Sequence, residues 1–309
     1  MTPQRRETLT SVVLPFAIFT GIWGSTWIVI RDQLGSVPPQ WSVTYRFIIA
    51  AAVMAIVARV KGEKLPHDAG AWRAILFLGF AQFFVNFNAV YLAERHITSG
   101  LVATVFALLV IPNTLLGWAF LGQRPTSRFV LGSLAAVAGI VLLFVHELQD
   151  HPGRTDAILI GIGLTLAGMT GASAANVFQA RAKVRAYPLF ALLAWSMAIG
   201  AVIDAALALA IAGPPVIEYR IGYWTGVLYL ALAASALGFS LYFPVVRRIG
   251  PAKAAYSSVL VPIIAMGFST AFEGYRWTPL AAAGAVLALG GMLGALSRSR
   301  SLVTAPDAA

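Results

Sequence analysis

The chain has 309 residues, of which 59% are hydrophobic and only 11% charged, and its mean hydropathy is +0.80. A soluble domain carries about 25% charged residues, so this composition excludes an ordinary water-soluble protein and indicates a lipid environment. The net charge of +10 does not indicate a nucleic-acid-binding protein, because the basic residues lie in short gaps between apolar runs. The absence of cysteine excludes disulfides, thiolate metal sites and a cysteine nucleophile.

Ten apolar runs follow one another along the chain, each close to the roughly 20 residues that a transmembrane helix needs. The first run follows Arg5 and Arg6 and is longer than the apolar region of a signal peptide, so we interpret it as a transmembrane helix. No gap between runs is long enough for a soluble domain. We predict an all-α polytopic membrane protein with ten transmembrane helices, at residues 12–30, 41–58, 74–93, 98–121, 129–145, 157–180, 188–212, 222–246, 251–272 and 278–296.

The basic residues alternate between the gaps in a way that predicts the orientation of the chain. The N-terminal segment and every second segment after it hold at least two Lys or Arg residues each. The segments that alternate with them hold one each. Lys and Arg concentrate on the cytoplasmic side of a membrane, so this pattern predicts cytoplasmic N- and C-termini. Loss of one helix would break the alternation, so the pattern also favours ten helices.

The two halves of the chain share glycines at a constant offset. Gly132 and Gly139 have the same spacing of seven residues as Gly284 and Gly291, and the two pairs are 152 residues apart. A repeat of about 150 residues holds five helices, and because five is odd, the second copy must enter the membrane in the opposite orientation. Such inverted repeats are typical of secondary transporters, with the substrate site between the repeats near mid-bilayer. We therefore predict two five-helix repeats, residues 1–150 and 151–309.

Several short motifs occur in an order that resembles the drug/metabolite transporter superfamily, EamA-type branch. They are Trp23-Gly24-Ser25-Thr26-Trp27, Pro38-Pro39, Arg46-Phe47 followed by Ala50-Ala51, and in each half a proline, Pro112 or Pro262, with Gln123 or Glu273 11 residues later. The family usually has glutamate at the last position, so Gln123 departs from its pattern and puts an ionic role there in doubt. Within the superfamily the whole chain is most similar to the YddG-type bacterial exporters of aromatic amino acids.

The resemblance implies a multi-pass secondary carrier of the bacterial inner membrane. Such a carrier would export aromatic and other neutral amino acids and related small metabolites by alternating access; the direction comes from the resemblance alone. No G-x-x-x-x-G-K-[ST] sequence is present, so the chain itself does not encode ATP-driven transport. The expected partners are a small-molecule substrate and the lipid bilayer, with no nucleic acid, no cofactor and no metal ion, and we expect a monomer.

Other functions stay open from the residues alone. A proton-coupled multidrug or metabolite exporter would use a buried acid, and Asp204 is the one acid well within a predicted helix, although an acid near a helix end is more commonly solvated. A channel-like facilitator would, like a carrier, need an aqueous path for its substrate through the bundle. We do not expect an enzyme, because no pair of carboxylates is buried and the four histidines, His67, His96, His146 and His151, lie in loops or at helix ends.

Polar residues inside apolar helices indicate where a substrate binds, since lipid offers them no hydrogen-bond partner. Gln82 and Asn86 lie four residues apart in the third helix, on one face near mid-bilayer, with Phe83 beside them. Their amides could bind an amino or carboxylate group, or form a bond between helices. Asn176 in the sixth helix has the same two interpretations.

Tryptophan in the first helix gives a second indication. Trp23 falls near mid-bilayer, where it could stack on a substrate or pack against small neighbours, whereas for Trp27 we expect an interfacial anchor. Thr104 in the fourth helix, and Tyr256 with Ser257 in the ninth, lie at similar depths from opposite faces. The predicted substrate-binding residues are therefore Trp23, Gln82, Phe83, Asn86, Thr104, Asn176, Tyr256 and Ser257.

Two prolines and one arginine complete the candidate residues. Pro112 and Pro262 free backbone carbonyls in the fourth and ninth helices, and they are either hinges for opposite gates or merely shape the bundle. Arg46 lies near the outer end of its helix. We expect it to reach the outer surface or to pair with Asp32 or Glu94; the alternative is that it binds a substrate carboxylate.

Small residues four apart predict close helix packing within the bundle. They are Gly132 and Ala136 in the fifth helix, and Gly290 and Gly294 in the last. The alternative is that these stripes support dimerisation.

Overall fold

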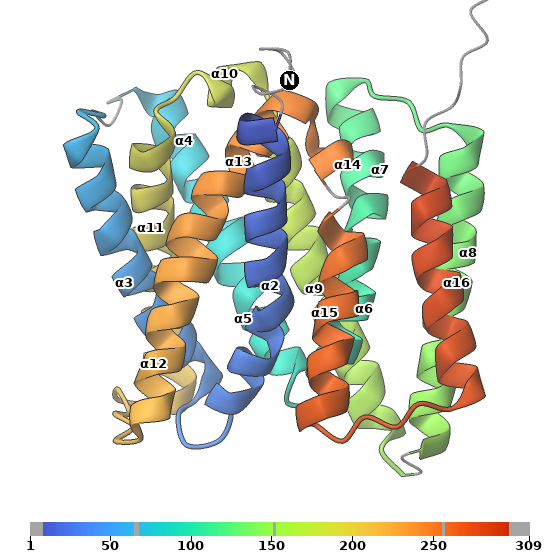
Figure 1. Ribbon diagram of the computed structural model, residues 1–309. Helices are drawn as coiled ribbons and strands as arrows, with labels where there is room; N and C mark the ends of the chain where they lie inside the picture. Colours follow the sequence, from blue (N-terminus) through green and yellow to red (C-terminus); the bar gives the residue numbers. More distant parts are fainter. Residues whose placement is uncertain (1–8, 65–67, 151–152, 255–256, 297–309) are drawn as a thin grey trace, which may run out of the picture.

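The computed structural model describes residues 9–64, 68–150, 153–254 and 257–296, and over these ranges the chain is built from helices (Figure 1). Within these described ranges, eight helical stretches are long and apolar enough to cross a membrane, and two more helices are apolar but shorter, Val259–Phe272 and Pro279–Ala295. The eight are Ser11–Gln33, Pro39–Val60, Ala69–Ala93, Ser99–Leu121, Ser127–Asp150, Thr155–Gln179, Leu189–Ala212 and Ile221–Ile249. Each of these helices overlaps one of the predicted apolar runs.

Four of these long helical stretches, or rods, change helix type along their length. In chain order the elements are η1 (Leu9–Val13), α2 (Leu14–Gln33), α3 (Pro39–Val60), α4 (Ala69–Leu78), η2 (Gly79–Val85), α5 (Asn86–Ala93), α6 (Ser99–Phe106), η3 (Ala107–Leu109), α7 (Val110–Leu121), α8 (Ser127–Asp150), α9 (Thr155–Gln179), α10 (Ala182–Arg185), α11 (Leu189–Ala212), α12 (Ile221–Tyr229), η4 (Leu230–Leu237), α13 (Gly238–Ile249), α14 (Pro251–Ala254), α15 (Ser257–Phe272) and α16 (Pro279–Leu296). The segments η2 and η4 are π-helical and begin 151 residues apart, close to the offset of the repeat.

Local chemistry places the helix ends. Pro39 opens α3, where the missing N–H of proline costs no helical hydrogen bond. Asp68 caps α4 by accepting a hydrogen bond from the Ala71 N–H at 2.9 Å, and it also accepts one from the Tyr187 hydroxyl. These two donors hold the pKa of Asp68 below its usual range. Gly122 ends α7 in the left-handed region, at φ +70°, which suits glycine.

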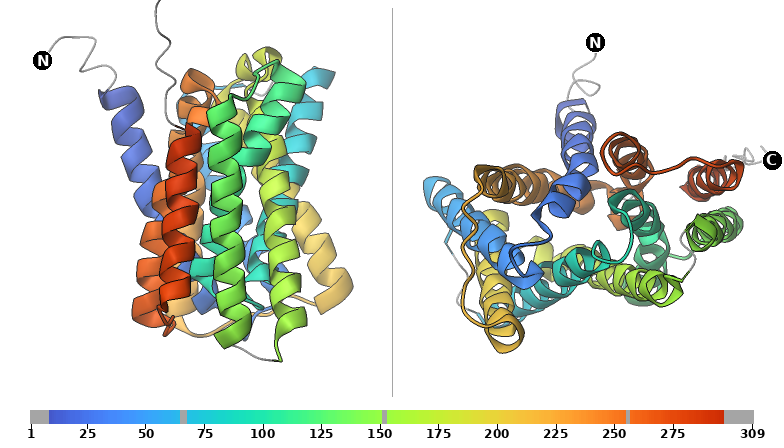
Figure 2. Two further views of the ribbon diagram at one scale, coloured as in Figure 1. Left: turned by 90° about the vertical axis from the view of Figure 1, so that its right-hand side faces the viewer. Right: turned by 90° about the horizontal axis from the view of Figure 1, so that it is seen from below.

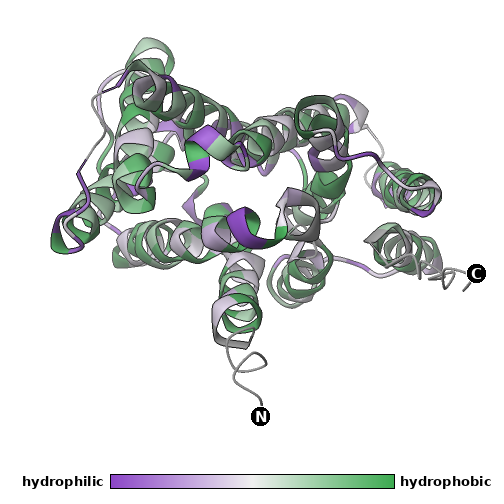
Figure 3. Cartoon of the chain, turned by 90° about the horizontal axis from the view of Figure 1, so that it is seen from above, coloured by the Kyte–Doolittle hydropathy of each residue, from purple (hydrophilic) through white to green (hydrophobic). Residues whose placement is uncertain are grey.

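Consecutive rods run in opposite directions (Figure 1), so the start of α2 and the end of α16 lie at the same end of the bundle. Seen along the rods, the helices surround the centre of the bundle, and α8 and α16 form a pair at one edge (Figure 2). Hydrophobic residues dominate the helices, whereas several connecting segments are hydrophilic (Figure 3). This distribution suits a bundle whose sides face lipid.

The α8–α16 pair is held by backbone contact at glycines. A Cβ added at Gly139 would lie 2.3 Å from the Ala288 nitrogen, and one at Gly291 would lie 2.6 Å from the Gly132 oxygen. The predicted close packing through Gly132 is therefore confirmed. The prediction for the last helix chose the wrong face, because a Cβ at Gly290 would meet nothing within 4 Å.

Candidate functional site

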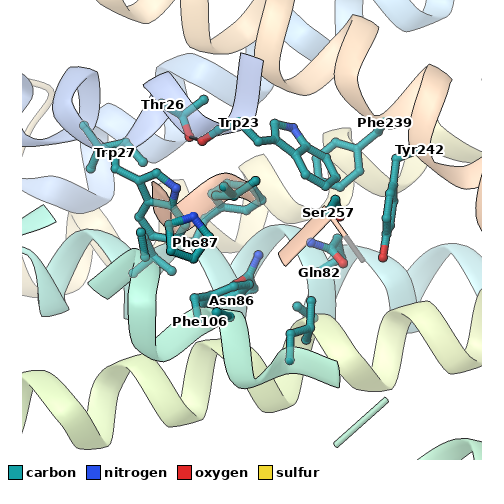
Figure 4. Close-up of a pocket in the computed structure, with 18 of the residues that line it drawn as sticks. Trp23, Thr26, Trp27, Gln82, Asn86, Phe87, Phe106, Phe239, Tyr242 and Ser257 are labelled. Carbon is teal, nitrogen blue, oxygen red and sulfur yellow. Dashed lines mark hydrogen bonds between the residues drawn. The ribbon is translucent and has the colours of Figure 1, made fainter. Parts of the chain in front are cut away.

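A cavity lies inside the bundle and is lined by residues from both halves of the chain (Figure 4). The centre of a water molecule could move through about 110 Å³ of it. Its lining is mostly aromatic and aliphatic with a few polar groups, as is typical of small-molecule sites. The lining residues are Trp23, Thr26, Trp27, Ile30, Arg46, Gln82, Asn86, Phe87, Val90, Ala103, Phe106, Ala107, Leu109, Ala172, Asn176, Phe239, Tyr242, Ser257, Val261 and Pro262.

The structure brings several of the predicted substrate-binding residues together and leaves others apart. Those that line the cavity are Trp23, Gln82, Asn86, Asn176 and Ser257. Phe83 is 1% exposed and packs against the rings of Phe47 and Phe239 instead of lining the cavity. Thr104 is also buried outside the lining and donates to the Gly100 carbonyl at 2.7 Å. Tyr256 lies outside the described residues, and substrate binding by any of the eight remains a prediction.

The two predicted hinge prolines lie in different surroundings. Pro262 is inside α15 and lines the cavity. Pro112 is in the first turn of α7, directly after the 3₁₀ segment η3, and is not part of the lining. Pro112 therefore lies near an irregular part of its helix, whereas Pro262 lies within an α-helix, where proline commonly causes a kink. A hinge at either position remains a prediction.

Trp23 packs against neighbouring residues and also lines the cavity, while stacking on a substrate stays a prediction. Its Nε1 donates to the Ala234 carbonyl at 3.0 Å. Its ring lies 4.8 Å from that of Tyr242 and 5.4 Å from that of Phe239, measured between centroids. Because Trp23 belongs to the first half and the other rings to the second, this aromatic cluster joins the halves at the cavity (Figure 4).

Trp27 lines the same cavity, and the prediction of an interfacial anchor was wrong. Its side chain is 8% exposed, its ring lies 5.6 Å from that of Phe106, and its Nε1 has no hydrogen-bond partner. The spacing of four residues from Trp23 already placed both indoles on one face of the helix. That spacing was the signal that could have identified Trp27.

Arg46 also lines the cavity, which contradicts the expectation that it reaches the outer surface or pairs with an acid. It is 2% exposed, and its Nε donates to the Ser235 hydroxyl at 2.9 Å. Asp32 pairs instead with Arg220, at 3.0 Å. The face of α3 that carries Arg46 packs against η4, so the guanidinium is turned inward.

Asp204 is fully buried, so the expectation of a solvated acid was wrong. It accepts a hydrogen bond from Asn88 Nδ2 at 2.5 Å, which links α11 to α5. It is not among the residues that line the cavity. Its carboxylate therefore meets a neutral amide of a neighbouring helix.

Polar contacts tie α2, α6 and α15 together at the end of the bundle away from the chain termini. The Glu273 carboxylate accepts hydrogen bonds from the Ser99 hydroxyl at 2.5 Å and from the Ser269 hydroxyl. Arg31 lies 3.6 Å from Glu273 and donates to the Glu94 carbonyl oxygen. The sequence does not predict this role of Glu273, because Ser99 and Arg31 lie far from it along the chain.

Comparison with known proteins agrees with this architecture. The model of the EamA-like transporter family matches residues 11–145 and again residues 159–297. A solved crystal structure with 20% identity superposes with a TM-score of 0.67 over 92% of this chain and 97% of the other, which shows a shared fold.

Three relatives cover most of the chain. A probable amino-acid metabolite efflux pump of Escherichia coli (strain K12) is 24% identical, over 88% of this chain and 90% of its own. The uncharacterized inner membrane transporter YedA of the same strain is 27% identical, over 84% and 81%. Protein PagO of Salmonella typhimurium is 20% identical, over 86% of each chain. The double match of the family model, over helices that enclose a common cavity, shows that this chain belongs to the EamA-like transporter family.

Proposed function

We propose that this protein is a secondary carrier of the bacterial inner membrane that exports aromatic and other neutral amino acids and related small metabolites by alternating access. The observation that carries the proposal is the cavity, whose aromatic walls and isolated polar groups come from both halves of the chain. Aromatic rings accommodate an apolar side chain, while amides and hydroxyls can pair with its polar end. The names of two relatives, an amino-acid metabolite efflux pump and an inner membrane transporter, support the direction and the membrane.

The carrier would have ten transmembrane helices in two inverted repeats, residues 1–150 and 151–309. The contacts of α8 and α16 support this arrangement, because Gly132 opposes Gly291 and Gly139 opposes Gly284. In the repeat, Gly132 corresponds to Gly284 and Gly139 corresponds to Gly291. Gly132 therefore faces the counterpart of Gly139, and Gly139 faces the counterpart of Gly132, as a two-fold axis between antiparallel helices requires. The two π-helical segments at equivalent positions support it as well. Use of the glycine face within the chain favours a monomer.

The orientation can be tested with single cysteines, because the natural chain has none. Ser36 is an exposed residue between α2 and α3, and Lys183 is an exposed residue of the short helix α10 at the other end of the bundle (Figure 1). In intact cells, a membrane-impermeant maleimide should label Ser36→Cys, and it should label Lys183→Cys only after permeabilisation, since the basic loops are expected inside. Labelling of Lys183→Cys alone in intact cells would reverse the orientation.

Transport itself is tested by flux. Liposomes that contain the purified protein should take up labelled phenylalanine or threonine faster than protein-free liposomes, down the concentration gradient. Unlabelled substrate trapped inside should accelerate uptake of the label, because a carrier returns faster when loaded. Absence of flux with folded protein would contradict the proposal, and flux without counterflow stimulation would favour a channel.

The proton-coupled alternative depends on Asp204, the buried acid of α11. Asn can accept the hydrogen bond of Asn88 through its amide oxygen, so Asp204→Asn should preserve the fold. We expect phenylalanine flux to stay within about twofold of wild type, because the carboxylate is not part of the cavity lining. Flux should be measured with and without a pH gradient. Proton coupling would be favoured if wild-type flux responded to the pH gradient and the variant lost that flux.

A further inference from the structure

Arg46 carries an unused hydrogen-bond donor at the cavity. Its guanidinium Nη1 is buried and has no hydrogen-bond partner, although Nε is bound to Ser235. The guanidinium carbon lies 4.4 Å from the centre of the Phe87 ring, which also lines the cavity. A cation held between a hydroxyl of one half and a ring of the other, with a donor left over, is costly unless a ligand completes it.

No acid balances this charge within the cavity lining. Among the described lining residues, Arg46 is the only one with a formal charge, and neither aspartate nor glutamate is present. The buried acid Asp204 of α11 is outside the lining and accepts a hydrogen bond from Asn88. The cavity is therefore electropositive, which disfavours organic cations and favours an anionic group.

Two further lining residues have unused polar atoms of the kind that an amino acid could satisfy. Trp27 Nε1 is a second donor without a partner. Asn86 Oδ1 is an acceptor without a partner, and because an amide can be turned over, either of its ends can face the cavity. Two donors suit the two oxygens of a carboxylate, and an amide oxygen suits an ammonium group.

We propose that Arg46 binds the carboxylate of the transported molecule and makes the cavity selective for amino acids and other monocarboxylates over uncharged and cationic analogues. This inference rests on the transport function proposed above and specifies its substrate class. Arginine presents its donors in a planar fork that matches a carboxylate, which lysine and glutamine do not. The aromatic walls then hold the rest of the molecule.

The test is competition against labelled phenylalanine flux in liposomes by four unlabelled molecules that share the phenylethyl skeleton. Phenylalanine and 3-phenylpropionate have the carboxylate, whereas phenylalaninamide and phenethylamine lack it. We expect the two carboxylates to compete at least about tenfold better than the other two, because the latter leave the buried guanidinium unpaired. The variant Arg46→Gln should lose this preference. The exposed Arg220 provides a matched control, and Arg220→Gln should retain it.

A second variant covers the case in which Arg46→Gln does not fold. Arg46→Lys keeps a cation in place but loses the fork, so the KM for phenylalanine should rise about tenfold while competition by phenylalaninamide changes little. Equal effects on both ligands would overturn the inference. So would wild-type flux without preference for carboxylates, although transport itself would then stand. Absence of any flux would instead contradict the proposed function.

Discussion

The Ala172→Phe variant is expected to remain folded and to lose transport. Ala172 lies in α9, is 4% exposed and lines the cavity. A phenyl ring at this position would occupy space that the substrate needs, so flux of labelled phenylalanine should fall roughly tenfold or more. The measurement is uptake into liposomes, normalised to the amount of protein that elutes as a single species in size-exclusion chromatography.

A matched control adds the same ring where it should have no effect. Ala138 lies on an exposed face of α8, where the added ring would meet lipid. Ala138→Phe should therefore transport like wild type. If Ala172→Phe also transported normally, the substrate would have to use a path other than this cavity.

The Gly139→Ala variant is expected to separate α8 from α16 and lower the melting temperature of the protein. The new Cβ would lie 2.3 Å from one backbone atom of α16 and 2.5 Å from another, and backbone atoms cannot move aside as the end of a side chain can. Overpacking of this kind costs about 1–3 kcal/mol, which exceeds the gain of up to about 1 kcal/mol from replacing a helical glycine by alanine.

Gly290 provides the control on the partner helix. Its added Cβ would meet nothing within 4 Å, so Gly290→Ala receives only the gain in helix propensity and should melt at or above the wild-type temperature. Both variants are compared by thermal unfolding in the same detergent. Equal melting temperatures would show that the two helices are not in backbone contact at Gly139.

The rods could be predicted from sequence because hydropathy alone determines them. Each needs only a run of apolar residues of sufficient length, and that signal is local. The π-helical segments could not be predicted, because their i→i+5 bonds reflect packing between rods and have no clear local pattern. The glycine face of α16 was missed for a similar reason: Gly290 and Gly291 are neighbours in sequence, and only the partner helix distinguishes them.

The candidate site was predictable only in part. The position of Gln82 and Asn86 at the cavity could be predicted, because lipid offers no hydrogen-bond partner to an amide inside an apolar run. Arg46 was misplaced because distance to a helix end was read along one helix, whereas its side chain is directed by the neighbouring η4. The contacts of Glu273 join residues 174 positions apart, a separation that no local pattern reveals.

The π-helical segment η2 has a consequence for the angular phase of its rod. Successive residues of an α-helix are turned by about 100°, so one additional residue held in a wider turn rotates every later side chain by about that angle relative to an unbroken helix. In this rod, α4 packs against α11, whereas α5 packs against α9. The wider turn thus lets a single rod present one apolar face to each of two neighbours and still direct Asn86 at the cavity. Deletion of one residue within η2 would change which side chains of α5 face the cavity without changing the sequence of α5 itself.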